Sequence, residues 1–131
     1  MIGPEVKRLA KTIVDHSTKL KKNEKVLIEA FDVPEEVVIT VIRQAEKAGA
    51  IPFVTLKTNR ILREIYHKAS EHSMKAIGKW EAARMKEMDA YVGIRGSFNT
   101  SELSDVPSEK MKLYQTHWLD PVHHKIRLKK K

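Results

Sequence analysis

The 131-residue sequence contains no cysteine. This absence excludes disulfides, thiolate metal sites and cysteine nucleophiles. No apolar run approaches the roughly 20 residues that a membrane-spanning helix requires. Residues 1–5 also lack the basic stretch followed by an apolar stretch that marks a secretory signal. We therefore expect a soluble, cytoplasmic protein of one domain that has no contact with a membrane.

Uncharged amides are also scarce, with three asparagines and two glutamines. Charged residues, in contrast, make up 32% of the chain, more than the roughly 25% of an average protein. A composition rich in lysine and glutamate and free of cysteine is the one reported for heat-adapted proteins. The composition thus favours a thermophilic source.

Acidic residues are absent after Asp120, and this explains most of the net charge of +8. Five of the eight charges come from the terminal segment, and the rest of the chain carries only +3. The five are Lys125, Arg127, Lys129, Lys130 and Lys131. A terminal lysine run is typical of a solvated end or a severed segment, so the charge does not favour a nucleic-acid partner.

Residues 24–57 carry the clearest structural pattern, which is strand, helix, strand. The short apolar run 25–30 and the β-prone run 52–56 flank a segment with apolar residues at helical spacing. We expect Asp32 to cap this helix with Glu35 reaching back, and Gly49 to end it. Such a unit is a right-handed crossover between parallel strands.

The remaining segments supply further helices and one more strand. The spacing predicts a helix from Pro4 to about residue 22, and a helix after Thr58 or Asn59 with a break at 70–73. A stripe of apolar residues at helical spacing follows this break, and we expect it to lie in the core. We expect a third strand over 90–95 to be central or nearly so. The stripe consists of Met74, Ile77, Trp80, Met85 and Met88.

Pro107 opens a last helix, which Pro121 is expected to end or kink. This order of elements predicts a three-layer α/β/α domain with a small, mainly parallel sheet and helices on both faces. We expect the domain to span residues 1–121 and residues 122–131 to form a basic tail.

Ligands of such sheets bind at the carboxyl ends of the strands. The segment Arg95-Gly-Ser-Phe-Asn99 follows the third strand and offers a guanidinium, a hydroxyl and an amide beside a glycine turn. Arg95, Ser97 and Asn99 are therefore the candidate ligand-binding residues. The alternative is an ordinary glycine turn with a surface arginine. No glycine-rich dinucleotide motif or Walker-type phosphate loop is present in the sequence.

The histidines do not form a recognisable metal motif. His67 and His72 are five positions apart and would lie on different faces of one helix. The group His117, Asp120, His123 and His124 is denser, but it lacks HExxH or comparable ligand spacing. The serines lack a GxSxG context. The residues alone therefore indicate no catalytic constellation and no metal site in this chain.

Three segments together resemble a known family. They are LKKNEKVLIEA at 20–30, AEKAGAIPFVTLK at 45–57 and MDAYVGIRGSFNTSELSDVPSEKM at 88–111. The sequence is similar to the N-terminal domain of the aminopeptidase T family of thermophilic metallopeptidases, over nearly all 131 residues. Asn99 and the segment Leu103-Ser-Asp105 contribute most to this likeness.

The resemblance implies a homodimeric exopeptidase that removes N-terminal residues from peptides with two divalent metal ions, such as zinc, cobalt or manganese. Family members are considerably longer, and their metal ligands belong to a C-terminal catalytic domain. No position of this chain matches a ligand. The resemblance therefore implies a non-catalytic domain that flanks the active-site cleft and supports dimer assembly, with residues 122–131 as the start of a linker.

A second interpretation comes from a different class of protein. The chain could be a stand-alone α/β binding module for a small anion at residues 95–99, or for nucleic acid through its lysine tail. A reading frame that continues past Lys131 distinguishes the first interpretation from the second.

Overall fold

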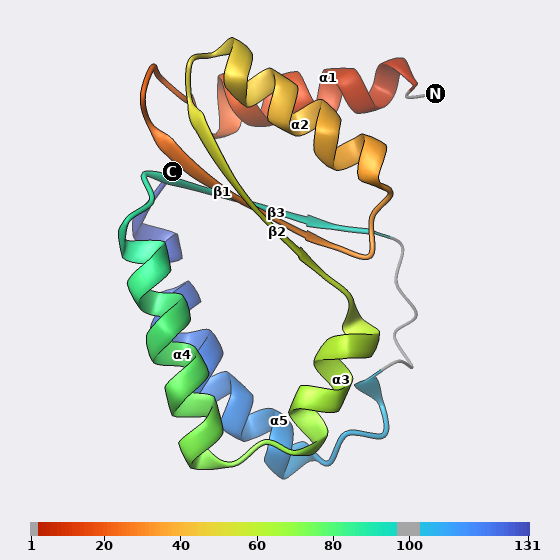
Figure 1. Ribbon diagram of the computed structural model, residues 1–131, viewed down its shortest axis with the longest axis vertical. Coiled ribbons are helices and arrows are strands. Elements are labelled where there is room, and N and C mark those ends of the chain that lie inside the picture. Colours follow the sequence, from red (N-terminus) through yellow and green to blue (C-terminus); the bar gives the residue numbers. More distant parts are fainter. Residues whose placement is uncertain (1–2, 97–102) are drawn as a thin grey trace.

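The computed structural model describes residues 3–96 and 103–131, which form three layers (Figure 1). The middle layer is a parallel sheet of three strands in the order β2-β1-β3. The strands are β1 (Lys25–Phe31), β2 (Ile51–Lys57) and β3 (Ala90–Arg95). The predicted three-layer α/β/α fold is therefore confirmed.

Helices cover both faces of the sheet (Figure 1). One face is covered by α1 (Pro4–Thr12) and α2 (Glu35–Lys47), and a π-helical turn, η1 (Ile13–Ser17), follows α1. The other face is covered by α3 (Asn59–His67), α4 (Glu71–Lys86) and α5 (Ser108–Tyr114). The π-helical segment η3 (Gln115–His124) continues α5, and the short 3₁₀ turn η4 (Arg127–Lys129) lies near the C-terminus. None of the described helices is long and apolar enough to cross a membrane.

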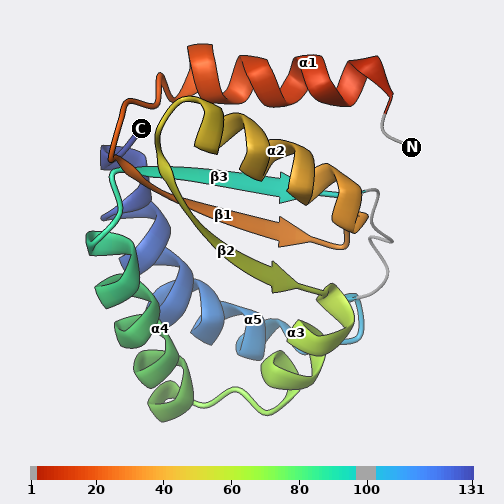
Figure 2. The same ribbon diagram turned by 45° about the horizontal axis from the view of Figure 1, so that its top comes forward.

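Strand β1 lies between its two neighbours (Figure 2) and is buried along nearly its whole length. Its side chains alternate between the faces of the sheet, as the period of a strand requires. Val26 and Ile28 pack in the core beneath α1 and α2, whereas Leu27 and Phe31 pack in the core on the side of α3, α4 and α5. The same alternation directs Glu29 into this second core.

The strand at 90–95 was predicted to be central or nearly so, but β3 lies at an edge of the sheet, next to the central strand β1. The start of β3 nevertheless resembles a buried strand, because the C-terminus of the chain pairs with it. The amide of Lys131 donates to the carbonyl of Asp89, and the amide of Tyr91 donates to the carbonyl of Lys131. The last residues of the chain thus cover the outer edge of β3 where it begins.

The predicted cap of α2 is also wrong. Asp32 has a φ of 55° and its carboxylate accepts the amide of Asn59 at 3.1 Å, so it joins the ends of β1 and β2 instead of capping α2. The N-cap residue of α2 is Pro34, which offers no side-chain acceptor. The predicted end at Gly49 is confirmed, since this residue has a φ of 85°, which glycine adopts without strain.

The predicted caps and breaks around α3 and α4 are close to the observed ones. Thr58 caps α3 by accepting the amide of Ile61, and Ser70 and Ser73 form a reciprocal capping box at the start of α4. The stripe on α4 is buried at Met74 and Met85, as expected, but Trp80 is 64% exposed. The core prediction is therefore wrong for Trp80.

Pro121 does not end the last helix. It lies inside η3, where the wider π-helical turns continue to His124. This segment packs closely against α4, because a Cβ added to Gly78 would lie 2.0 Å from the carbonyl oxygen of His117. The close approach of the two backbones places Trp118 and Val122 in the core, where both are buried.

Candidate functional site

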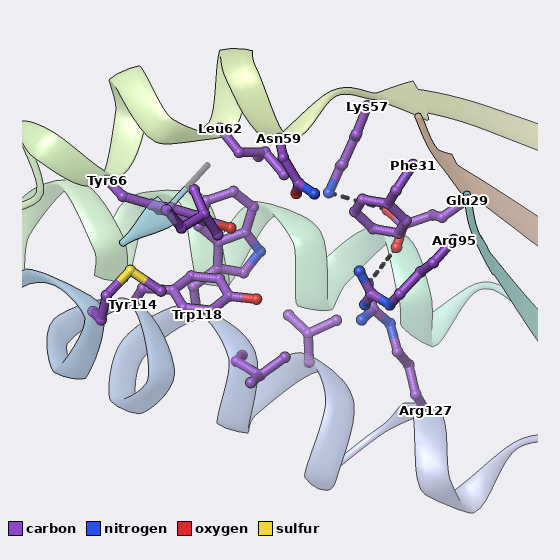
Figure 3. Close-up of a pocket in the computed structure, with 14 residues that line it drawn as sticks. Glu29, Phe31, Lys57, Asn59, Leu62, Tyr66, Arg95, Tyr114, Trp118 and Arg127 are labelled. Atoms are coloured by element: carbon purple, nitrogen blue, oxygen red, sulfur yellow. Dashed lines mark hydrogen bonds and ion pairs between the residues drawn. The ribbon is translucent and has the colours of Figure 1, made fainter. Parts of the chain in front are cut away.

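A cavity of about 130 Å³ lies between the carboxyl ends of the strands and the helical layer of α3, α5 and η3 (Figure 3). Its polar lining consists of Glu29, Lys57, Asn59, Arg95 and Arg127. Its other wall is apolar and aromatic. This wall consists of Phe31, Leu62, Tyr66, Leu103, Met111, Tyr114, Trp118, Leu119 and Val122.

Glu29 is the centre of the polar wall and is completely buried. Its Oε1 accepts hydrogen bonds from Arg127 Nη2 at 2.7 Å and from Tyr91 Oη at 2.8 Å. Its Oε2 lies 3.1 Å from Lys57 Nζ and 3.0 Å from Arg84 Nη2. Each carboxylate oxygen therefore has two donors, which is what a buried anion requires.

The protonation of this group follows from its neighbours. Burial acts to raise the pKa of Glu29, but the positive charges of Lys57 and Arg127 and the hydrogen bond from Tyr91 outweigh it, so the pKa lies below its usual value. Burial, together with the negative charge of Glu29, raises the pKa of Tyr91. Glu29 is therefore ionised and Tyr91 is neutral at pH 7.

A second carboxylate, that of Glu81, belongs to the same ionic network as Glu29. Glu81 on α4 accepts a hydrogen bond from Arg84 and lies 3.7 Å from Lys57 Nζ. Arg84 also donates to the hydroxyl of Thr55. The two acids thus share Lys57 and Arg84, which connects β1, β2 and α4 through one ionic network.

Arg95 lies at the end of β3, as the sequence predicts, and lines this cavity. Its guanidinium is 4.2 Å from the centre of the Phe31 ring, a distance typical of a cation–π contact. The other two candidates, Ser97 and Asn99, lie outside the described residues. The structure instead places Arg95 beside Asn59 and Arg127, neither of which was predicted as a site residue.

One feature of the sequence indicates the polar wall of this cavity. Glu29 is the only acidic residue inside the apolar run Val26–Phe31, and a charge in a buried strand needs partners. The partners could not be read from the sequence, since Tyr91 is 62 positions and Arg127 is 98 positions away.

The aromatic wall is built from three rings in mutual contact. The ring centres of Tyr66 and Tyr114 are 4.6 Å apart, and those of Tyr114 and Trp118 are 5.2 Å apart. Burial raises the pKa of both tyrosines. Both phenols are therefore neutral near pH 7 and can donate or accept hydrogen bonds at the cavity.

The histidines that follow Trp118 do not converge on a metal site. Asp120 and His124 form a pair, with Oδ1 and Nδ1 2.6 Å apart, and the ring of His123 is 5.1 Å from that of His124. Over residues 3–96 and 103–131, no three histidine, aspartate or glutamate side chains form a group that could hold a metal ion.

A larger, apolar groove lies between β2, α3 and α4. Its volume is about 520 Å³, and Leu56, Ile61 and Trp80 line it while remaining 63%, 63% and 64% exposed. Strand β2 is the free edge of the sheet beside this groove, and most of its residues are exposed or half-buried. An apolar surface joined to an open strand edge is typical of an interface.

Comparison with known proteins identifies a family from the sequence and a similar fold among solved structures. Residues 3–127 match the sequence model of the thermophilic metalloproteases (M29). Among solved structures, wild-type AmpT from Thermus thermophilus has the same fold, with a TM-score of 0.69 and 21% sequence identity. The match covers 95% of this chain but only 32% of AmpT, so this chain spans about a third of that protein. No curated protein matches.

Proposed function

Because the chain belongs to the thermophilic metalloprotease (M29) family, we propose that it is the N-terminal, non-catalytic part of a metal-dependent aminopeptidase. The observation that supports this proposal most strongly is the coverage, since the chain matches AmpT over nearly its own length and over a third of AmpT. In this role the domain flanks the active-site cleft for peptide substrates. The location that fits such an enzyme is the cytoplasm.

Membership of a metalloprotease family implies divalent metal ions, which need several carboxylate or histidine ligands close together. The described residues offer the Asp120–His124 pair but no third ligand beside it. This donor set does not fit a two-metal centre, in which the ions polarise a carbonyl and activate water. We therefore propose that two ions, zinc, cobalt or manganese, are held by residues of a longer protein beyond this chain.

The test is aminopeptidase activity on a panel of amino-acid anilides with added cobalt, zinc or manganese. The 131-residue chain is compared with a longer protein from the same gene. We expect metal-dependent hydrolysis by the longer protein and none by the 131-residue chain. Hydrolysis by the short chain that disappears in His124→Ala would overturn the proposal and identify the Asp120–His124 pair as part of a metal site.

The apolar groove and the free edge of β2 are the surfaces that suit contact with the remainder of such an enzyme. We propose that the rest of the longer chain covers Leu56, Ile61 and Trp80, and that this packing supports a dimer. The exposed apolar side chains stabilise such a contact by about 25 cal/mol for each Å² removed from water.

Iodide quenching of Trp80 fluorescence measures this covering. The contribution of Trp80 is the difference between the native protein and Trp80→Phe, a substitution at an exposed position. We expect strong quenching in the 131-residue chain and weak quenching in the longer protein, with light scattering reporting a dimer for the latter. Equal quenching of Trp80 in both proteins would show that the groove stays open and would exclude this docking surface.

A further inference from the structure

The cavity beside Glu29 carries more positive than negative charge. Lys57, Arg95 and Arg127 line it, and Glu29 is its one acidic lining residue among those described. Glu29 pairs with both Lys57 and Arg127, and the lining residues together carry a net charge of +2 at a site that is mostly walled by apolar side chains. Arg95 is exposed, whereas Lys57 and Arg127 are mostly buried and paired with Glu29. The net positive charge of the lining attracts an anion from solution to this cavity.

Arg127 gives the second, independent observation. Its side chain is 91% buried, since only 9% is exposed, and its Nη2 donates to Glu29. Its Nε, however, has no acceptor among the described residues. Buried polar groups are nearly always hydrogen-bonded. This Nε is itself shielded, and the guanidinium carbon lies 4.2 Å from the centre of the Tyr91 ring. Arg127 therefore offers the cavity a buried positive charge that Glu29 and Tyr91 hold in place.

Arg95 supplies the opposing cation. It stacks on Phe31 and makes no ion pair within residues 3–96 and 103–131. Stacking leaves the edge of a guanidinium free to bind the two oxygens of a carboxylate. Figure 3 shows Arg95 and Arg127 at the same end of the cavity as Glu29 and opposite the rings of Tyr114 and Trp118.

We propose that this cavity binds a small carboxylate with a short branched alkyl tail, with the carboxylate between Arg95 and Arg127 and the tail against Leu62, Tyr114 and Trp118. The volume of about 130 Å³ is close to that of an engineered cavity of about 150 Å³ that binds benzene. Isovalerate is a molecule of this size and shape.

The walls also discriminate between classes of anion. Inorganic phosphate needs donors on all of its oxygens, but the apolar side of the cavity would strip water from it without replacing those bonds. A free amino acid would bring its ammonium group beside three cations, and like charges at such distances repel. A carboxylate without an ammonium group and with an apolar tail matches both walls.

The test is the rise in the thermal unfolding midpoint of the 131-residue protein with added isovalerate, because a ligand that binds the folded state stabilises it. We expect a saturable rise with isovalerate, a smaller one with acetate, and none with isovaleramide, the neutral isostere. An equal rise with isovaleramide, or tighter binding of phosphate or leucine than of isovalerate, would overturn the proposal.

The Arg95→Gln variant tests whether the Arg95 guanidinium binds the carboxylate of the ligand. We expect its Kd for isovalerate to rise about tenfold or more, as loss of a charged hydrogen bond requires, whereas Arg43→Gln on the exposed side of α2 keeps the native Kd. An unchanged Kd in Arg95→Gln would exclude this site. In the native protein, the Nε–H resonances of Arg95 and Arg127 must also shift with isovalerate, and their failure to shift would exclude it independently of any variant.

Discussion

We expect the substitution Glu29→Gln to lower the free energy of unfolding at pH 7 by about 3–5 kcal/mol, the cost of removing one partner from a buried charge cluster. Glutamine keeps the size of the side chain but not the charge that balances Lys57, Arg84 and Arg127. Since the whole stability of a domain is roughly 5–15 kcal/mol, this one change removes a large share. Urea unfolding followed by circular dichroism measures it.

The control for this variant is Glu46→Gln on the exposed surface of α2. Surface substitutions of this kind change stability by less than about 0.5 kcal/mol. If both variants unfold at the same urea concentration as the native protein, the buried network does not stabilise the fold and the charges around Glu29 are compensated in another way.

The pH dependence of the free energy of unfolding is a second test of the role of Glu29. The pKa of Glu29 is lower in the folded protein than its ordinary value of 4.5, so the folded state holds the proton less tightly than the unfolded state does. The stability from Glu29 is therefore fully present above pH 4.5 and is lost as the pH falls through the lower pKa of the folded state. The difference in stability between the native protein and Glu29→Gln should shrink over this acidic window. A constant difference would contradict the sign of the shift.

The second large effect is expected for Gly78→Ala. Alanine is a better helix former than glycine by about 1 kcal/mol, so helix propensity alone predicts that this variant is more stable. The added Cβ, however, would lie 2.0 Å from the carbonyl oxygen of His117. This oxygen belongs to the backbone of η3 and cannot rotate away, so we expect a net loss of about 3 kcal/mol, at the upper end of the cost of overpacking.

Lys79→Ala is the matched control, because the neighbouring position on α4 is exposed and the change should alter the unfolding midpoint very little. A rise in the thermal midpoint of Gly78→Ala would show that α4 and η3 are not in close contact in solution. Loss of near-ultraviolet circular dichroism from Trp118 in this variant would report that the packing of η3 is disturbed.

Much of the fold was predictable because local patterns decide it. The run at 25–31, the helical spacing of 35–47 and the strand at 90–95 were all predicted within a few residues. The resemblance to the metallopeptidase family also rested on short sequence segments, and the match over residues 3–127 confirms it. The boundary at residue 121 and the binding roles of Ser97 and Asn99 stay predictions.

The errors share a physical cause, which is that they concern contacts between distant segments. Asp32 had the spacing of a helix cap, but its carboxylate accepts the amide of Asn59 instead. The apolar strand at 90–95 looked central, but its outer edge is covered at the start by Lys131. Trp80 shared the spacing of the buried methionines, but the groove beside it is open.

The sequence by itself determined the elements, their order, the three-layer class and the family, because periodicity, turn residues and short motifs act over a few residues. Only the tertiary structure decided that Glu29, Arg95 and Arg127 line one cavity. Arg127 reaches Glu29 across 98 positions of sequence, and nothing in the local pattern of a basic tail indicates a buried partner. The charge balance of the site depends on how the C-terminal segment packs on the sheet, and that packing is a property of the whole fold.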